Sequence, residues 1–167
     1  MKRGMIALAM TVGVVTGGIS GTREAAAAYR IVSASACDDY HYGAPSSAWF
    51  YAGQWYTASF SGWVYCPMPF DDQIQPGNVT TTYVFVYDSS PIVEATARSC
   101  VNDAYGLTVS CGTPSGSGTT YVGVAYMTPG PVPAPFHSWG SYYLEVSMPK
   151  DSSGRGQSLN SFYVYQP

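Results

Sequence analysis

The sequence predicts an all-β protein, a two-sheet antiparallel β-sandwich of about eight strands that is jelly-roll-like or immunoglobulin-like. From Ser47 onward, short runs of β-branched and aromatic residues alternate with clusters of Gly, Pro, Asn, Asp and Ser. No segment shows the sustained 3.6-residue hydrophobic period of a helix. The four cysteines lack the C-x-x-C spacing of a zinc site and are typical of a disulfide-bonded exported domain.

The N-terminal segment, residues 1–28, has the pattern of a secretory signal peptide. It starts with two basic residues, continues through an apolar stretch over 4–15 and ends in four alanines. The apolar stretch is shorter than the roughly 20 residues that span a bilayer. We therefore expect a secreted protein with one mature domain over 29–167 and no transmembrane segment. A periplasmic location, or a lipid anchor on Cys37 behind the small residues Ala34-Ser35-Ala36, is the alternative.

The charge of the expected mature domain argues against nucleic acid as a partner. Residues 29–167 hold nine acidic residues against four basic ones, a net charge near −5 with His neutral. No run of Lys or Arg is present to neutralise phosphates. With few charged residues and many aromatic ones, surface polarity has to come from Ser, Thr, Asn, Gln and tyrosine hydroxyls.

The predicted strands lie over 49–51, 55–57, 63–66, 79–87, 92–101, 107–111, 119–127, 142–148 and 161–165. In the run 142–148, alternation directs the even-numbered residues to the core and places Glu145 on the outer side. The segment "TTYVFVYD", residues 81–88, is apolar on both faces, with Tyr83, Phe85 and Tyr87 on one side and Val84 and Val86 on the other, which predicts a central strand covered on each side.

The cysteines allow three disulfide pairings. The segment around Cys100 and Cys111 is typical of two strands joined by an Asn102-to-Gly106 turn, which would place these two cysteines on facing strands. Cys37 would then pair with Cys66.

Four short motifs occur in a fixed order: Gly53 ahead of the strand 55–57, the strand end "WVYCPMP", the strand end "SCV" and the following "SCG". In these motifs the chain resembles a group of small secreted bacterial proteins. The resemblance implies an exported all-β domain with two disulfides, and it brings no activity with it.

A sugar-binding platform is the main candidate site. If one strand ran unbroken over 55–66, Trp55, Trp63 and Tyr65 would point outward as a row of flat aromatic rings, on which pyranose faces stack. The pair Ser61-Gly62 is also a bulge signal, and an inserted residue would turn Trp63 and Tyr65 into the core. Both alternatives stay open from the sequence.

A second aromatic cluster follows the proline-rich stretch "PGPVPAP". This stretch favours an extended polyproline II segment, which could present the aromatics to a glycan or protein partner. The cluster consists of Phe136, His137 and Trp139.

Metal and catalytic signals are weak. Asp71 and Asp72 would lie near Asp38 and Asp39 if Cys37 and Cys66 were bonded, and their oxygens suit calcium, although no EF-hand loop pattern supports a site. No other cofactor is expected and no catalytic residue is assigned, because neither a G-x-S-x-G nor an H-E-x-x-H motif occurs.

The sequence thus favours a non-catalytic module that binds an extracellular carbohydrate or cell-surface ligand. One alternative is a structural or matrix protein whose tyrosine-rich, weakly charged surface holds copies together. A further alternative is a glycan hydrolase that uses Glu145 with an aspartate, since glycoside hydrolysis needs two carboxyl groups. Glu94 and Glu145, both on predicted strands, otherwise suit solvated positions.

Overall fold

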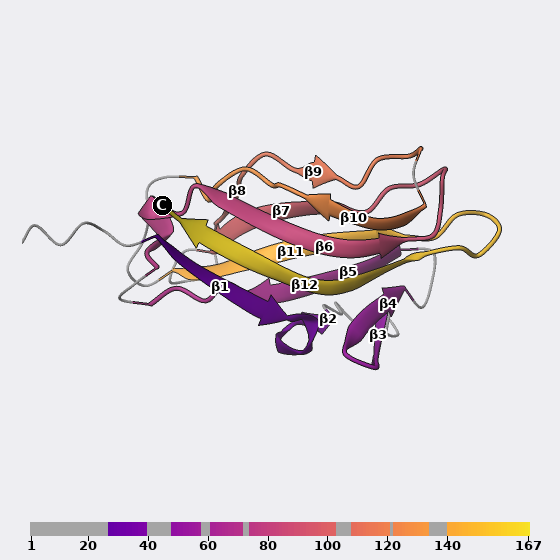
Figure 1. Cartoon of the computed structure of the whole chain (residues 1–167), viewed down its shortest axis with the longest axis horizontal. Coiled ribbons are helices and arrows are strands. Elements are labelled where there is room, and N and C mark those ends of the chain that lie inside the picture. The colour runs from indigo at the N-terminus through magenta and orange to yellow at the C-terminus, as the bar shows by residue number, and fades with distance from the viewer. Residues whose placement is uncertain are drawn as a thin grey trace, which may run out of the picture.

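The computed structural model describes residues 27–39, 48–57, 61–71, 74–102, 108–120, 122–133 and 140–167. It confirms the predicted all-β sandwich, with two antiparallel sheets of six strands each (Figure 1). The helical elements in these ranges are two 3-10 turns, η1 (Ala34–Ala36) and η2 (Pro76–Asn78). No helix in the described part of the chain is long and apolar enough to cross a membrane.

The first sheet has the strand order β10-β6-β12-β4-β3, and β1 pairs with β12 beside β4. In Figure 1, β1, β12, β6 and β10 form the layer nearer the viewer. Its strands are β1 (Ala28–Ser33), β3 (Ala48–Tyr51), β4 (Gln54–Thr57), β6 (Thr81–Asp88), β10 (Gly123–Met127) and β12 (Gln157–Gln166).

The second sheet has the order β2-β5-β11-β7-β8, and β9 also pairs with β7. Strand β11 lies at its centre, with β5 on one side and β7 on the other. Its strands are β2 (Asp38–Asp39), β5 (Ser61–Pro67), β7 (Thr96–Asn102), β8 (Val109–Cys111), β9 (Ser115–Gly116) and β11 (Ser141–Pro149).

The core fills the space between the sheets, because alternate residues of each strand point inward. Phe162 and Leu159 from β12 meet Leu144 and Val146 from β11, and all four side chains are fully buried. Burying a side chain of this size stabilises the fold by about 1.5–3 kcal/mol before entropy is counted. The prediction that the even-numbered residues of 142–148 face the core is confirmed at positions 144, 146 and 148.

Every predicted strand run overlaps an observed strand, but β1, β2 and β9 were not predicted. Ala28, assigned to the signal peptide, opens β1. Residues 1–26 of the predicted signal peptide lie outside the described residues, so export stays a prediction.

The prediction that the segment 81–88 is covered on both sides is wrong. Val84 and Val86 of β6 are fully buried in the core, whereas Tyr83 and Phe85 are half-buried and Tyr87 is exposed. The strand is central within its sheet, between β10 and β12, as predicted. Its aromatic side instead forms part of the outer surface of the sandwich.

Both predicted disulfides are confirmed. Cys100 lies opposite Cys111 on neighbouring strands and is bonded to it, and Cys37 is bonded to Cys66. Because the Cys37 sulfur belongs to this bridge, it has no thiol to carry a lipid, and the lipid-anchor alternative is wrong. Two disulfides are typical of proteins that work outside the reducing cytosol.

A buried polar network organises the loop between β11 and β12. The Asp151 carboxylate accepts hydrogen bonds from the Ser153 hydroxyl at 2.6 Å, the Ser90 hydroxyl at 2.9 Å, and the backbone and side chain of Arg155. These hydrogen bonds hold the pKa of Asp151 below its ordinary value, and the bond from Ser153 has the largest effect.

We expect Asp151 to make the stability of the protein depend on acid pH. A carboxyl group with a lowered pKa in the folded state stabilises the fold above its unfolded pKa of about 3.9. That contribution is lost as the pH falls through about 4 and below. Unfolding of the wild type near pH 3.5 should therefore take up more protons than unfolding of Asp151→Asn, by at most about one. Denaturant unfolding at several pH values between 3 and 6 measures this difference as the slope of the free energy of unfolding against pH. Equal slopes for the two proteins would contradict the prediction.

Candidate functional site

The outer face of the second sheet carries a row of polar and aromatic side chains from four neighbouring strands. Glu145 of β11 lies directly opposite Tyr65 of β5 on one side and Arg98 of β7 on the other. Asp38 of β2 continues the row beyond Tyr65. Trp63 lies two residues before Tyr65 on β5, on the same face. The register of the sheet therefore brings these side chains together from segments far apart in the sequence.

Trp63 and Tyr65 point outward because β5 buries its other side. Val64 and Cys66 are fully buried in the core, and alternation places their neighbours on the outer face. Trp63 keeps 39% of its surface exposed. Of the two alternatives left open by the sequence, the one that places these two rings in the core is wrong.

Residues 55–66 do not form one unbroken strand, which was the condition for an outward row that includes Trp55. Strand β4 ends at Thr57 in the first sheet, and β5 starts at Ser61 in the second. Trp55 packs against the core, and its indole N–H donates to the Ala34 carbonyl at 2.8 Å. Trp55 therefore lies apart from Trp63 and Tyr65.

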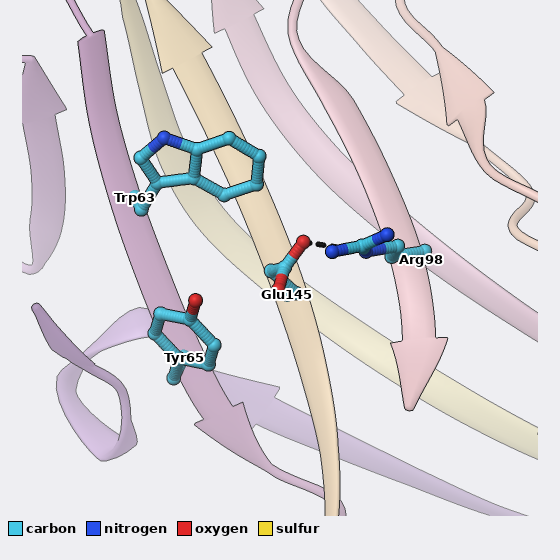
Figure 2. A pocket seen from close by; sticks show the side chains of 4 residues that line it. All are labelled: Trp63, Tyr65, Arg98 and Glu145. Carbon is cyan, nitrogen blue, oxygen red and sulfur yellow. Dashed lines mark hydrogen bonds and ion pairs between the residues drawn. The ribbon is translucent and has the colours of Figure 1, made fainter. Parts of the chain in front are cut away.

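Trp63, Tyr65, Arg98 and Glu145 line an open groove of about 290 Å³. Figure 2 looks onto the strands and shows the two aromatic rings along β5, with the broad side of the Trp63 indole facing the viewer. Glu145 lies between the aromatic pair and Arg98. The groove thus combines flat ring surfaces on one side with a charged hydrogen-bonding pair on the other.

The charged pair is short and unequally exposed. Arg98 donates through Nε to Oε1 of Glu145 at 2.5 Å, and their side chains are 44% and 6% exposed. This hydrogen bond raises the pKa of Arg98, so the guanidinium stays charged. Glu145 is on the predicted side of β11, but the expectation of a solvated glutamate is wrong, because its side chain is largely buried in the groove and is paired with Arg98.

Glu94 is not where the sequence predicted it. It precedes β7 instead of lying within a strand, is partly buried, and accepts a hydrogen bond from the Gly118 amide at 3.1 Å. It does not line the groove that contains Glu145.

The second predicted aromatic cluster, Phe136, His137 and Trp139, lies outside the described residues, and so does Asp72. Asp71 pairs with Arg30 at 3.1 Å, and its carboxylate also accepts from the Ile74 amide. Within the described ranges no three Asp, Glu, His or Cys side chains are grouped to hold a metal ion. Calcium binding with Asp72 stays an untested prediction.

Arg98 is the groove residue that the sequence reasoning missed. Its alternation with Ala97 and Ser99, which are both buried, would have placed it on the outer face. Its partner could not be inferred, because the pairing of β7 with β11 joins residues 47 positions apart.

Comparison with known proteins shows a likeness of fold. No protein-family model and no curated protein sequence matches the chain. A solved structure described as a low-affinity xylan-binding module, CBM86, from the xylanolytic gut symbiont Roseburia intestinalis superposes with a TM-score of 0.50. The match covers 84% of this chain and 96% of that one at 16% sequence identity.

Proposed function

We propose that this chain is a carbohydrate-binding module that holds a neutral polysaccharide in the groove lined by Trp63, Tyr65, Arg98 and Glu145. The observation that carries the proposal is the indole of Trp63, which lies open on the outer face of the second sheet beside a buried carboxylate. One face of a pyranose ring presents C–H groups and stacks on an aromatic ring. The hydroxyl groups at its rim need donors and acceptors nearby.

The ion pair supplies both kinds of partner. The Glu145 carboxylate accepts from a hydroxyl, and the terminal nitrogens of Arg98 donate to a neighbouring pair of hydroxyl oxygens in the fork geometry of a guanidinium. Each charged group already holds the other in place through the 2.5 Å bond. Little side-chain entropy is therefore lost when a ligand binds.

The charge of the groove favours neutral over acidic glycans. The positive charge of Arg98 is balanced by Glu145, and Asp38 adds a negative charge on the far side of Tyr65. The chain as a whole is also negative, with a formal net charge of −3. A polyuronate would be repelled, whereas a chain of neutral sugars would not.

The likeness of fold to a low-affinity xylan-binding module supports the proposal. The lining of the groove disfavours the hydrolase alternative. Glycoside hydrolysis needs two carboxyl groups, whereas Glu145 is the one carboxylate among the described residues that line the groove.

Isothermal titration with three soluble hexasaccharides tests the proposal: xylohexaose, cellohexaose and hexagalacturonic acid. We expect at least one neutral hexasaccharide to bind and the acidic one to bind at least tenfold more weakly. Arg98→Lys keeps the positive charge but removes the paired N–H donors of the guanidinium, so it should weaken the binding of the neutral sugar. Exclusive binding of the acidic sugar, or the same affinity in Arg98→Lys, would contradict the role given to the ion pair.

A further inference from the structure

The outer face of the first sheet carries a second, larger surface, which we call the tyrosine face. Its outward side chains come from β1, β12, β6 and β10, which lie side by side in Figure 1. They are Tyr29, Ile31, Tyr83, Phe85, Tyr87, Val124, Tyr126, Tyr163 and Tyr165. Several are among the most exposed large hydrophobic residues of the described chain, and none carries a charge at neutral pH.

The rings at the centre of the tyrosine face stack on one another. Tyr163 lies 4.6 Å from Tyr83 and 5.7 Å from Phe85, measured between ring centroids, with interplanar angles of 28° and 30°. Tyr83 in turn contacts Tyr126 at 6.3 Å. Rings that cover each other's faces present their edges and hydroxyl groups to solvent. A sugar needs open ring faces, so this surface suits a sugar less well than the Trp63 groove does.

Aliphatic side chains lie at the two sides of the face. Ile31 of β1 is 69% exposed, and Val124 of β10 on the opposite side is similarly open. Between β1 and β12, an apolar hollow of about 300 Å³ is lined by Tyr29, Ile31, Tyr163 and Tyr165. An exposed, contiguous apolar surface of this kind marks an interaction site more often than an isolated exposed residue does.

The size and charge of the face fit a second copy of the chain. Four strands spaced by about 4.8 Å, with about eight residues of 3.4 Å each along β6, give a footprint of roughly 500 Å². Two such faces together would bury roughly 1,000 Å², the area at which specific interfaces start. Because the chain has a net charge of −3, two copies meet with least repulsion through a surface without charge.

We propose that the protein forms a dimer in which the tyrosine faces of two copies pack against each other. The Trp63 grooves, which lie on the second sheet, would then face away from each other on the two outer sides of the dimer. In combination with the proposed function, this arrangement gives a bivalent module that bridges two polysaccharide chains. Two linked sites bind a surface more tightly than one, without any new contact.

Sedimentation velocity without glycan tests the dimer independently of carbohydrate binding. The wild type should show twice the monomer mass, and Ile31→Glu should raise the dimer dissociation constant at least tenfold, because it buries a charge in the interface. Ile92→Glu is the matched control, since Ile92 is 63% exposed and lies outside the tyrosine face. Val124→Glu gives a second test on the opposite side of the face if Ile31→Glu does not fold by circular dichroism.

The proposal is overturned if the wild type stays monomeric at all accessible concentrations, or if the Ile31→Glu and Ile92→Glu proteins associate equally. A third result would also overturn it: loss of hexasaccharide binding in Ile31→Glu with unchanged mass, which would make the face a glycan surface. Bivalence predicts that Ile31→Glu binds an insoluble polysaccharide at least tenfold more weakly than the wild type and binds a soluble hexasaccharide equally well.

Discussion

Replacing Trp63 with alanine is expected to weaken the binding of neutral oligosaccharides by about 30-fold, the loss of about 2 kcal/mol that defines a binding hot spot. The indole is the largest open ring surface in the groove, and alanine leaves the apolar face of the sugar against water. The free energy of unfolding should change by only about 1 kcal/mol, because the side chain lies on the outer face of β5.

Tyr51→Ala is the matched control for this prediction. Tyr51 is an exposed aromatic residue at the turn between β3 and β4, on the first sheet. Titration calorimetry on the three proteins should give the same affinity for the wild type and Tyr51→Ala. Equal weakening by both substitutions would mean that exposed rings bind glycan without a defined groove.

Removing the Cys37–Cys66 disulfide is expected to have the largest effect on stability. The bridge closes a loop of 29 residues, for which the chain-entropy model gives about 3.5 kcal/mol, and both sulfurs belong to the core. A Cys37→Ala/Cys66→Ala double variant also leaves a cavity there, so we expect a total loss of about 4–5 kcal/mol. That loss is a large part of the 5–15 kcal/mol by which a typical domain is stable.

The Cys100–Cys111 bridge provides the internal comparison. It spans only 11 residues, for which the same model gives about 3 kcal/mol. Cys111 is partly exposed, so less packing is lost with it. Urea unfolding of both double variants should rank the Cys37–Cys66 variant as the less stable, and the reverse ranking would contradict this account.

Alternation along single strands predicted much of the fold. The runs around Val84, Leu144 and Phe162 were recognised because β-branched and aromatic residues recur in short segments bounded by turn residues. The cysteine pairing followed from one local feature, a turn between Cys100 and Cys111. In each case the signal lies within about a dozen neighbouring residues.

Features that depend on distant pairing could not be predicted. Glu145 was expected to be solvated because nothing in its own strand shows that it pairs with Arg98. The chain changes sheet between Thr57 and Ser61, and this change separates Trp55 from Trp63 although only seven positions lie between them. Strand β1 was overlooked because it starts at the expected cleavage site.

The tyrosine face shows that an apolar composition on both sides of a strand does not always predict burial. An apolar run on both sides of a strand usually means burial on both sides, and this reasoning failed at Tyr83, Phe85 and Tyr87. Tyrosine has an apolar ring and a polar hydroxyl, so it can lie at the surface of an open sheet. In the proposed dimer, the second copy would cover these three residues. Strand β6 would then be covered on both sides.

The indole N–H resonances of the protein during titration with a neutral hexasaccharide test the central claim most directly. The chain has four tryptophans, so its ¹H–¹⁵N spectrum should contain four indole signals, and the Trp63→Ala variant assigns one of them. We predict that the Trp63 signal shifts with saturation while that of Trp55, hydrogen-bonded to the Ala34 carbonyl, stays in place. A stationary Trp63 signal in the presence of a bound sugar would place the binding site elsewhere and contradict the account.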